Sequence, residues 1–171
     1  MSHAQGASHP HAEAARRSAR CAVLTVSDTR GPSDDAGGAA VDAELRKGGH
    51  AVVARAWCRD DAVEIRRHAV ELLARDDVDA LVATGGTGLA PRDVTPEAFA
   101  PLLEKALPGF GEAFRRESDA EVGGAAWLSR AGAGVADGRL VAWLPGSPKG
   151  AALGARLLAE QLGHVVALLR G

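Results

Sequence analysis

The sequence predicts an α/β fold in which a mainly parallel sheet is covered by helices on both faces. Short apolar segments rich in β-branched residues alternate with longer segments whose apolar residues recur at helical spacing. Most of the apolar segments end in loops that contain glycine, proline or aspartate. A chain of 171 residues without internal repeats can bury one full core, so we expect a single domain.

The first half of the chain is predicted to contain three strands and two helices. Short apolar runs typical of strands buried on both faces occupy residues 21–27, 51–57 and 79–84. The segment 35–47 is predicted to be a helix that ends at Gly48 and Gly49, because glycine commonly terminates helices. Alanine, isoleucine and leucine recur at helical spacing in the segment 61–75, which predicts a second helix with one buried face.

Two further helices are predicted after the third strand. Thr95 is a suitable N-cap and Pro96 a suitable first residue for a helix that continues through about Lys105. Because proline is favoured at the start of a helix, a second one is predicted to begin at Pro108.

The end of the chain is predicted to form a hairpin and a long helix. Two apolar runs at 131–136 and 139–144 are separated by an Asp-Gly dipeptide, which favours a tight hairpin turn. This hairpin would add an antiparallel member at one edge of the sheet. The last helix is predicted to begin near Ser147 and Pro148 and to continue almost to the end of the chain.

Composition excludes several classes of function. A net charge of −2 gives no general attraction to nucleic acid or to an anionic membrane. Cys21 lies in a predicted strand and Cys58 at the end of one, so we expect small buried side chains rather than a disulfide framework or a zinc site. Residues 1–19 lack the aliphatic residues of a core and predict a disordered tail before a folded domain at 20–171. With no signal peptide or membrane span predicted, we expect a cytoplasmic protein.

Two loops at the predicted carboxyl edge of the sheet are suited to phosphate, and open α/β sheets bind ligands at this edge. TGGTG at 84–88 offers unhindered backbone N–H groups and two threonine hydroxyls. PGSPK at 145–149 combines Ser147 and a helix N-terminus with Lys149. Neither matches a Walker A or a dinucleotide fingerprint, and tight turns alone could require the glycines. Their occurrence at one edge favours anion binding.

Two aspartates add a second feature to this edge. Asp60 and Asp93 each follow a strand, and a carboxylate beside a phosphate-binding loop repels the ligand unless a cation intervenes. Mg²⁺ held by one or two carboxylates and the substrate phosphates would resolve that conflict. Alternatively, Asp60 or Asp61 caps the next helix, and Asp93 forms an exposed pair with Arg92. The residues alone thus predict a magnesium-assisted, phosphate-handling α/β protein.

Several segments together resemble the MoaB/Mog family of molybdenum cofactor biosynthesis, to which the G domain of gephyrin belongs. They are LTVSDTR (24–30), DDAGG (34–38), TGGTGLAPRDVTPEA (84–98), PGFGEAFRRES (108–118), LSRAGAGV (128–135) and LPGSPKG (144–150). The resemblance covers residues 20–171 in order. It implies a three-layer α/β/α fold, a homotrimer or a hexamer of two trimers, and contacts with other proteins of molybdenum cofactor biosynthesis.

Catalytic members of the family adenylylate molybdopterin with MgATP and release pyrophosphate. The resemblance therefore implies a molybdopterin adenylyltransferase, a nucleotidyltransferase with Mg²⁺ as cofactor and with ATP and molybdopterin as substrates. It assigns Asp60 and Asp93 to catalysis and to holding Mg²⁺. It assigns nucleotide and molybdopterin binding to Ser27, Asp28, Thr84, Gly85, Gly86, Thr87, Gly88, Ser118, Pro145, Gly146, Ser147 and Lys149.

The match to the catalytic members is mixed. Arg59-Asp60-Asp61 stands where they usually have Pro-Asp-Glu, which leaves open which of the two aspartates is the functional acid. The segment 118–140 is more similar to the MoaB branch, which includes bacterial members without adenylylation activity, whereas 90–98 is similar to the catalytic type. The alternative to an enzyme is therefore a non-catalytic molybdopterin carrier or scaffold.

A third hypothesis is an assembly module in which Trp127 and Trp143 serve an oligomer interface. Large aromatic residues more often pack in the core, so core packing is the expectation for both tryptophans.

Overall fold

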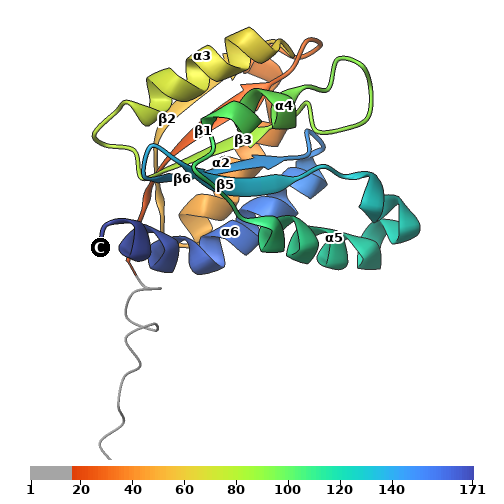
Figure 1. Cartoon of the computed structure of the whole chain (residues 1–171). Helices are drawn as coiled ribbons and strands as arrows, with labels where there is room; N and C mark the ends of the chain where they lie inside the picture. The colour runs from red at the N-terminus through yellow and green to blue at the C-terminus, as the bar shows by residue number, and fades with distance from the viewer. Residues whose placement is uncertain (1–16) are drawn as a thin grey trace, which may run out of the picture.

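The computed structural model describes residues 17–171 and shows a mixed six-stranded sheet between two layers of helices (Figure 1). The sheet order is β2 (Ala51–Cys58), β1 (Arg20–Val26), β3 (Ala80–Thr84), β6 (Arg139–Leu144), β5 (Gly132–Ala136) and β4 (Lys105–Ala106). The first four strands are parallel, whereas β5 and β4 continue the sheet antiparallel to their neighbours. The predicted α/β fold, with its antiparallel hairpin, is confirmed.

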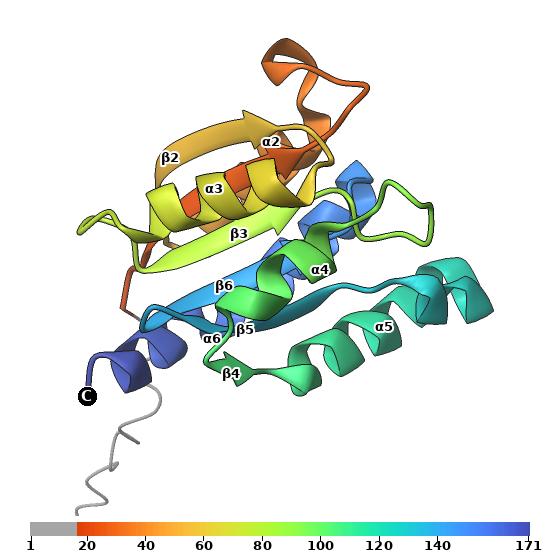
Figure 2. The ribbon, with the colours of Figure 1, turned by 45° about the horizontal axis from the view of Figure 1, so that its top comes forward.

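Helices cover both faces of the sheet (Figure 2). They are α2 (Ala36–Lys47), α3 (Ala62–Leu73), α4 (Thr95–Phe99), α5 (Pro108–Val122) and α6 (Pro148–Leu169), with short 3₁₀ helices at Pro32–Asp34, Ala100–Leu102 and Gly123–Leu128. Successive strand side chains point to opposite faces, so Val23 packs with α2 and α6 whereas Leu24 packs with α3 and α4. The sheet therefore lies between two separate hydrophobic cores.

The predicted helix from Thr95 to Lys105 is wrong in its length. The α-helix ends at Phe99 and gives way to the 3₁₀ helix at Ala100–Leu102. Pro101 has no backbone N–H and cannot donate to the carbonyl of Glu97, four residues earlier, which accounts for this early end. Lys105 instead lies in β4, where it pairs with β5 at the edge of the sheet.

The predicted tail, residues 1–19, lies almost wholly outside the described residues. Ala19 already belongs to the fold: its side chain is buried, and its carbonyl accepts a hydrogen bond of 2.9 Å from the Ala51 N–H. Its own N–H donates to Nδ1 of the buried His50 at 3.1 Å. Nε2 of His50 therefore carries the proton and donates to the Ala159 carbonyl at 2.9 Å, which ties the start of β1 to α6.

Cys21 and Cys58 are both free and buried, as predicted. Burial raises the pKa of each thiol to about 12, so both remain protonated at neutral pH. Thiolate is the reactive form of cysteine, and these two side chains therefore act as small packing groups.

The last helix, α6, is the one described helix that is long and apolar enough to span a membrane by length and composition. Its apolar composition has a different explanation in the fold. Leu158 and Leu162 on α6 lie in the same core as Val41 and Leu45 of α2, beneath the sheet. This is the packing expected of a central helix in a globular protein.

The two tryptophans differ in their surroundings. Trp143 is buried in the core and stacks on Phe99, with ring centroids 5.5 Å apart. Trp127, in the 3₁₀ helix that follows α5, leaves 75% of its surface exposed. Core packing is therefore confirmed for Trp143 and wrong for Trp127.

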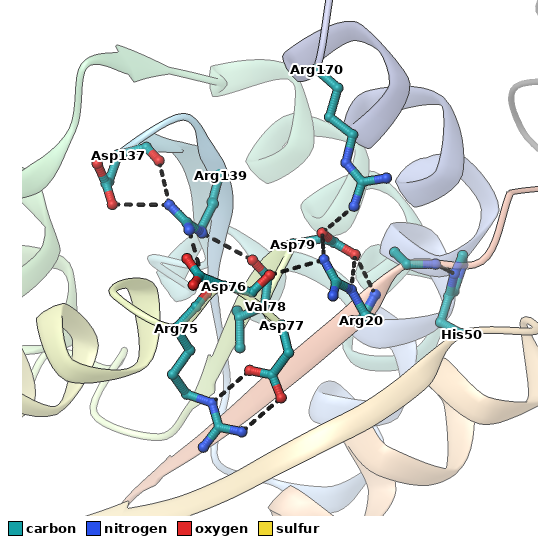
Figure 3. A network of polar contacts seen from close by, with 11 residues as sticks. Arg20, His50, Arg75, Asp76, Asp77, Val78, Asp79, Asp137, Arg139 and Arg170 are labelled. Atoms are coloured by element: carbon teal, nitrogen blue, oxygen red, sulfur yellow. Dashed lines mark hydrogen bonds and ion pairs between the residues drawn. The ribbon is translucent and has the colours of Figure 1, made fainter.

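Asp79, at the amino-terminal edge of the sheet, accepts hydrogen bonds from two arginines (Figure 3). The Arg20 backbone N–H donates at 2.8 Å and its guanidinium at 3.0 and 3.1 Å, and Arg170 donates to the same carboxylate. Burial alone would raise the pKa of Asp79, but these hydrogen bonds lower it to about 2. The ionised carboxylate therefore stabilises the folded state.

Replacing Asp79 by asparagine is expected to lower the free energy of unfolding by about 2 kcal/mol at pH 7. Because its folded pKa lies below the unfolded value, this stabilisation is present above about pH 4 and is lost as the pH falls toward 2. Urea unfolding at pH 7 and pH 3 measures the difference. The control is Asp77→Asn, which removes an exposed pair with Arg75; equal losses in both variants would contradict this account.

Candidate functional site

A cleft of about 570 Å³ opens at the edge of the sheet where β1, β2, β3 and β6 end. Its walls come from the loops that follow these four strands, at the carboxyl edge predicted to bind ligands. The predicted residues that line it are Ser27, Asp28, Asp60, Thr84, Gly85, Gly86, Thr87, Gly88, Asp93, Pro145, Gly146 and Ser147. Tertiary structure thus gathers twelve of the fourteen predicted site residues from distant parts of the chain.

The other two predicted residues, Ser118 and Lys149, line a neighbouring hollow of about 620 Å³. This hollow lies between α5 and the start of α6, and its lining is mostly apolar. It shares Ser129, Pro145 and Ser147 with the cleft, so the two spaces adjoin along one wall.

Several lining residues were missed by sequence reasoning. They are Thr25, Val26, Thr29, Arg30, Gly37, Arg92, Leu128 and Ser129. All of them lie within segments that resemble the MoaB/Mog family, and that position is the signal by which the sequence could have identified them. Arg92 was considered only as a partner for Asp93, yet no ion pair joins the two within residues 17–171, and Arg92 lines the cleft instead.

Gly85 joins the glycine loop to the strands beside it. Its N–H donates to the Leu144 carbonyl at 3.0 Å, and its own carbonyl accepts from the Thr95 hydroxyl at 2.8 Å. The backbone has φ of +107°, and a Cβ at this position would overlap the carbonyl oxygen of Val26. Glycine is therefore required for the loop to lie this close to the end of β1. Thr95 serves this loop and is not the helix cap that we predicted, since Val94 precedes the first turn.

The loop before α6 is held to β3. The Thr84 hydroxyl donates to the Pro145 carbonyl at 2.8 Å, so it joins two loops of the cleft. The Ser147 hydroxyl accepts from the Gly150 N–H at 3.2 Å and caps α6, which confirms the predicted start of that helix. The N-cap of a 22-residue helix consequently borders the cleft, its first turn borders the adjoining hollow, and helix N-termini favour anions.

Asp60 and Asp61 have different roles in the structure. Asp61 caps α3 by accepting hydrogen bonds of 2.9 Å from the backbone N–H groups of Val63 and Glu64. Asp60 lines the cleft, and its Oδ1 is buried without a hydrogen-bond partner. Geometry therefore separates the capping aspartate from the aspartate that is available to a ligand.

The surroundings of Asp60 disfavour its negative charge. Burial raises the pKa of Asp60 to about 6, and the carboxylates of Asp28 and Asp93 act in the same direction. Asp28 also accepts a hydrogen bond of 3.0 Å from the Asp60 backbone N–H. A Cβ at Gly86 would overlap Oδ1 of Asp60, so the glycine loop lies directly against this carboxylate. Such a carboxylate is a candidate partner for a cation.

Asp93 lies on the loop that follows the glycines. Its Oδ2 accepts a hydrogen bond of 2.9 Å from the Ala90 N–H. A Cβ at Gly88 would be 2.6 Å from the same oxygen, so Gly88 allows Asp93 to fold back on the loop. The loop thus presents glycine backbone and a carboxylate to one cleft.

The carboxylate oxygens of Asp60 and Asp93 suit a cation that is also bound by a substrate. No group of three or more histidine, cysteine or acidic side chains within residues 17–171 could hold a metal ion without help. Mg²⁺ commonly takes only one or two protein carboxylates and completes its ligands with water and substrate phosphates. The partnerless Oδ1 of Asp60, beside a glycine loop, provides the kind of oxygen that such an ion requires.

Comparison with known proteins identifies relatives over almost the whole chain. A family model described as a probable molybdopterin binding domain matches residues 22–164. Molybdenum cofactor biosynthesis protein B of Halalkalibacterium halodurans is 41% identical over 158 residues, which cover 91% of this chain and 93% of that protein. The Bacillus subtilis protein of the same name is 40% identical over 162 residues, which cover 94% of this chain and 95% of that protein.

Solved structures agree with the sequence relatives. The tungsten cofactor synthesizing protein MoaB from Pyrococcus furiosus has a TM-score of 0.83 and 34% identity, covering 91% of this chain and 99% of that one. The chain therefore belongs to the MoaB/Mog family of molybdenum cofactor biosynthesis proteins.

Proposed function

We propose that this protein binds molybdopterin and MgATP in the cleft and adenylylates molybdopterin. An oxygen of the terminal phosphate of molybdopterin attacks the α-phosphorus of ATP and forms a new P–O bond. The bond from the α-phosphorus to the bridging oxygen of the β-phosphate breaks, and pyrophosphate leaves with that electron pair. Such transfers depend on positioning and charge neutralisation rather than on covalent catalysis by the protein.

The observation that carries this proposal is the buried, partnerless Oδ1 of Asp60 against the glycine loop. Asp60 and Asp93 would hold Mg²⁺, which when bound would neutralise charge on the phosphate oxygens. The backbone of residues 85–88 would face the nucleotide phosphates, and the absence of side chains at Gly85, Gly86 and Gly88 would let the phosphates approach closely.

The remaining predicted residues would complete the ligand pocket. Ser27 and Asp28 would line the nucleotide site, and the Pro145–Ser147 loop would present the first turn of α6 to a phosphate. Ser118 and Lys149 would contact ligand in the adjoining hollow. The trimeric or hexameric assembly, the contacts with other proteins of the pathway and the cytoplasmic location stay predictions.

Pyrophosphate release by the purified protein tests the proposal. We expect release that requires molybdopterin, ATP and Mg²⁺ together, and a rate that falls about 100-fold in Asp93→Ala. Asp119→Ala, at an exposed position of α5, is the control and should keep the wild-type rate. Release at the normal rate from an Asp60→Ala, Asp93→Ala double variant would refute the assignment of the site.

The second candidate function is a carrier that holds molybdopterin without turnover. It is favoured by Arg59, which stands where catalytic members usually have proline. Arg59 is exposed and does not itself line the cleft, but it directly precedes Asp60, which does. Multiple turnovers by homogeneous protein would exclude the carrier. Bound molybdopterin without pyrophosphate release would support it, and Arg59→Pro would then be the first variant to test.

A further inference from the structure

Arg130 binds both ends of the loop that carries Asp93. Its Nε donates to the Gly88 carbonyl at 3.0 Å, and its Nη2 donates to the Asp93 carbonyl at 2.7 Å. Its backbone N–H also donates to the Thr87 carbonyl at 3.3 Å. One guanidinium therefore bridges the first and last residues of the segment Gly88–Asp93.

Arg130 is itself fixed by two elements of the core. Its Nη1 forms an ion pair with Glu97 on α4. Its carbonyl accepts a hydrogen bond of 2.9 Å from the indole N–H of Trp143 on β6. Trp143 in turn stacks on Phe99 of α4. The side chain of Arg130 is thus held by the exposed Glu97 of α4, and its backbone by the buried Trp143 of β6.

The loop has few other means of holding its position. Residues 85–94 contain neither helix nor strand. Within the loop, Asp93 bonds only to Ala90, through its own N–H and through its carboxylate. The bonds from Thr95 to Gly85 and Gly86 join the two flanks of the loop, where it leaves β3 and enters α4, and do not reach the segment Gly88–Asp93. Within the described residues, the Arg130 guanidinium therefore supplies the side-chain link from both ends of Gly88–Asp93 to the body of the protein.

We propose that Arg130 is a positioning residue that fixes Asp93 for the transfer reaction. This inference rests on the proposed function for the role of Asp93, but the structural link itself does not. A planar guanidinium can donate to two carbonyls at fixed separation, which a lysine ammonium cannot reproduce. Small displacements of groups that position substrates cost up to about 100-fold in rate.

Hydrogen exchange of the full-length protein tests the link without any ligand. In Arg130→Met, the amides of Ala90 and Asp93, which donate hydrogen bonds within the segment Gly88–Asp93, are expected to exchange about tenfold faster, because the loop opens more often. The matched control is Arg139→Met. Arg139 also donates to backbone carbonyls, those of Val78, Arg75 and Asp137, but at the opposite edge of the sheet (Figure 3). Unchanged exchange in Arg130→Met, or equal changes in both variants, would overturn the inference.

Pyrophosphate release tests the effect on Asp93. Arg130→Met is expected to lower kcat about tenfold with a smaller change in KM for ATP, and Arg139→Met to change neither. In the Asp93→Ala background, Arg130→Met should cause no further loss, because both changes act through one group. Independent, additive losses would overturn the inference.

Arg130→Lys keeps the charge and tests the bridging geometry if Arg130→Met does not fold. We expect an intermediate increase in exchange and a lowered kcat, since one ammonium cannot hold both carbonyls. Wild-type exchange and rate in Arg130→Lys would overturn the inference. If the wild-type protein releases no pyrophosphate, the proposed function fails, and exchange alone then decides whether Arg130 fixes the loop.

Discussion

Replacing Asp60 by alanine is expected to lower the rate of pyrophosphate release about 1000-fold without loss of stability. The Oδ1 atom of the Asp60 carboxylate is buried without a hydrogen-bond partner, and the charges of Asp28 and Asp93 oppose ionisation of this carboxylate. Removing it therefore relieves unfavourable interactions in the folded state while it removes a proposed ligand of Mg²⁺. Steady-state release and urea unfolding at fixed protein concentration measure the two effects.

The neighbouring aspartate provides a matched control. Asp61→Ala removes the side chain that caps α3 and is expected to lower the free energy of unfolding by about 1 kcal/mol. Its rate should remain close to that of the wild type, because Asp61 lies outside the cleft lining. The account would be contradicted if Asp61→Ala lost the activity and Asp60→Ala kept it.

Replacing Gly85 by alanine is expected to lower the free energy of unfolding by about 3 kcal/mol or more. A φ of +107° is unfavourable for alanine, and the added Cβ would overlap the backbone carbonyl of Val26. Hydrogen bonds to Leu144 and Thr95 hold Gly85 in place, so the loop cannot shift to relieve that overlap. Urea unfolding measures the loss.

Gly49→Ala separates the two causes of the stability loss in Gly85→Ala, which are the unfavourable φ and the overlap of the added Cβ. Gly49 has φ of +87°, but a Cβ there would meet no atom within 4 Å. Gly49→Ala is therefore expected to lower the free energy of unfolding by only about 1 kcal/mol, from backbone strain alone. If Gly85→Ala were no less stable than Gly49→Ala, the close approach of the glycine loop to β1 would be incorrect.

Local patterns in the sequence predict most of the fold. The segment 61–75 has apolar residues at helical spacing, and α3 buries the face that carries them. The Asp-Gly dipeptide at 137–138 predicts a tight hairpin turn, and both residues have the positive φ that such a turn requires. The segment 95–105 shows where local reasoning fails. Thr95 resembles a helix cap, but its hydroxyl bonds to Gly85, a contact that only the tertiary structure creates.

The candidate site also has features that the sequence predicts and features that only the tertiary structure creates. Parallel strands end at one edge, so the sequence could predict that loops after several strands meet there. It could not distinguish Asp60 from Asp61, because the difference lies in which carboxylate caps α3. Nor could it predict that Arg130, more than thirty residues beyond the glycine loop, binds that loop through its guanidinium.

The fate of the α-phosphate of ATP tests the central claim most directly. The full-length protein would be incubated with molybdopterin, Mg²⁺ and ATP labelled at the α-phosphorus, and the pterin product then separated. The account predicts label attached to molybdopterin, with one pyrophosphate released for each adenylyl group transferred. Molybdopterin that binds to the protein but remains unlabelled would contradict it and identify the protein as a carrier.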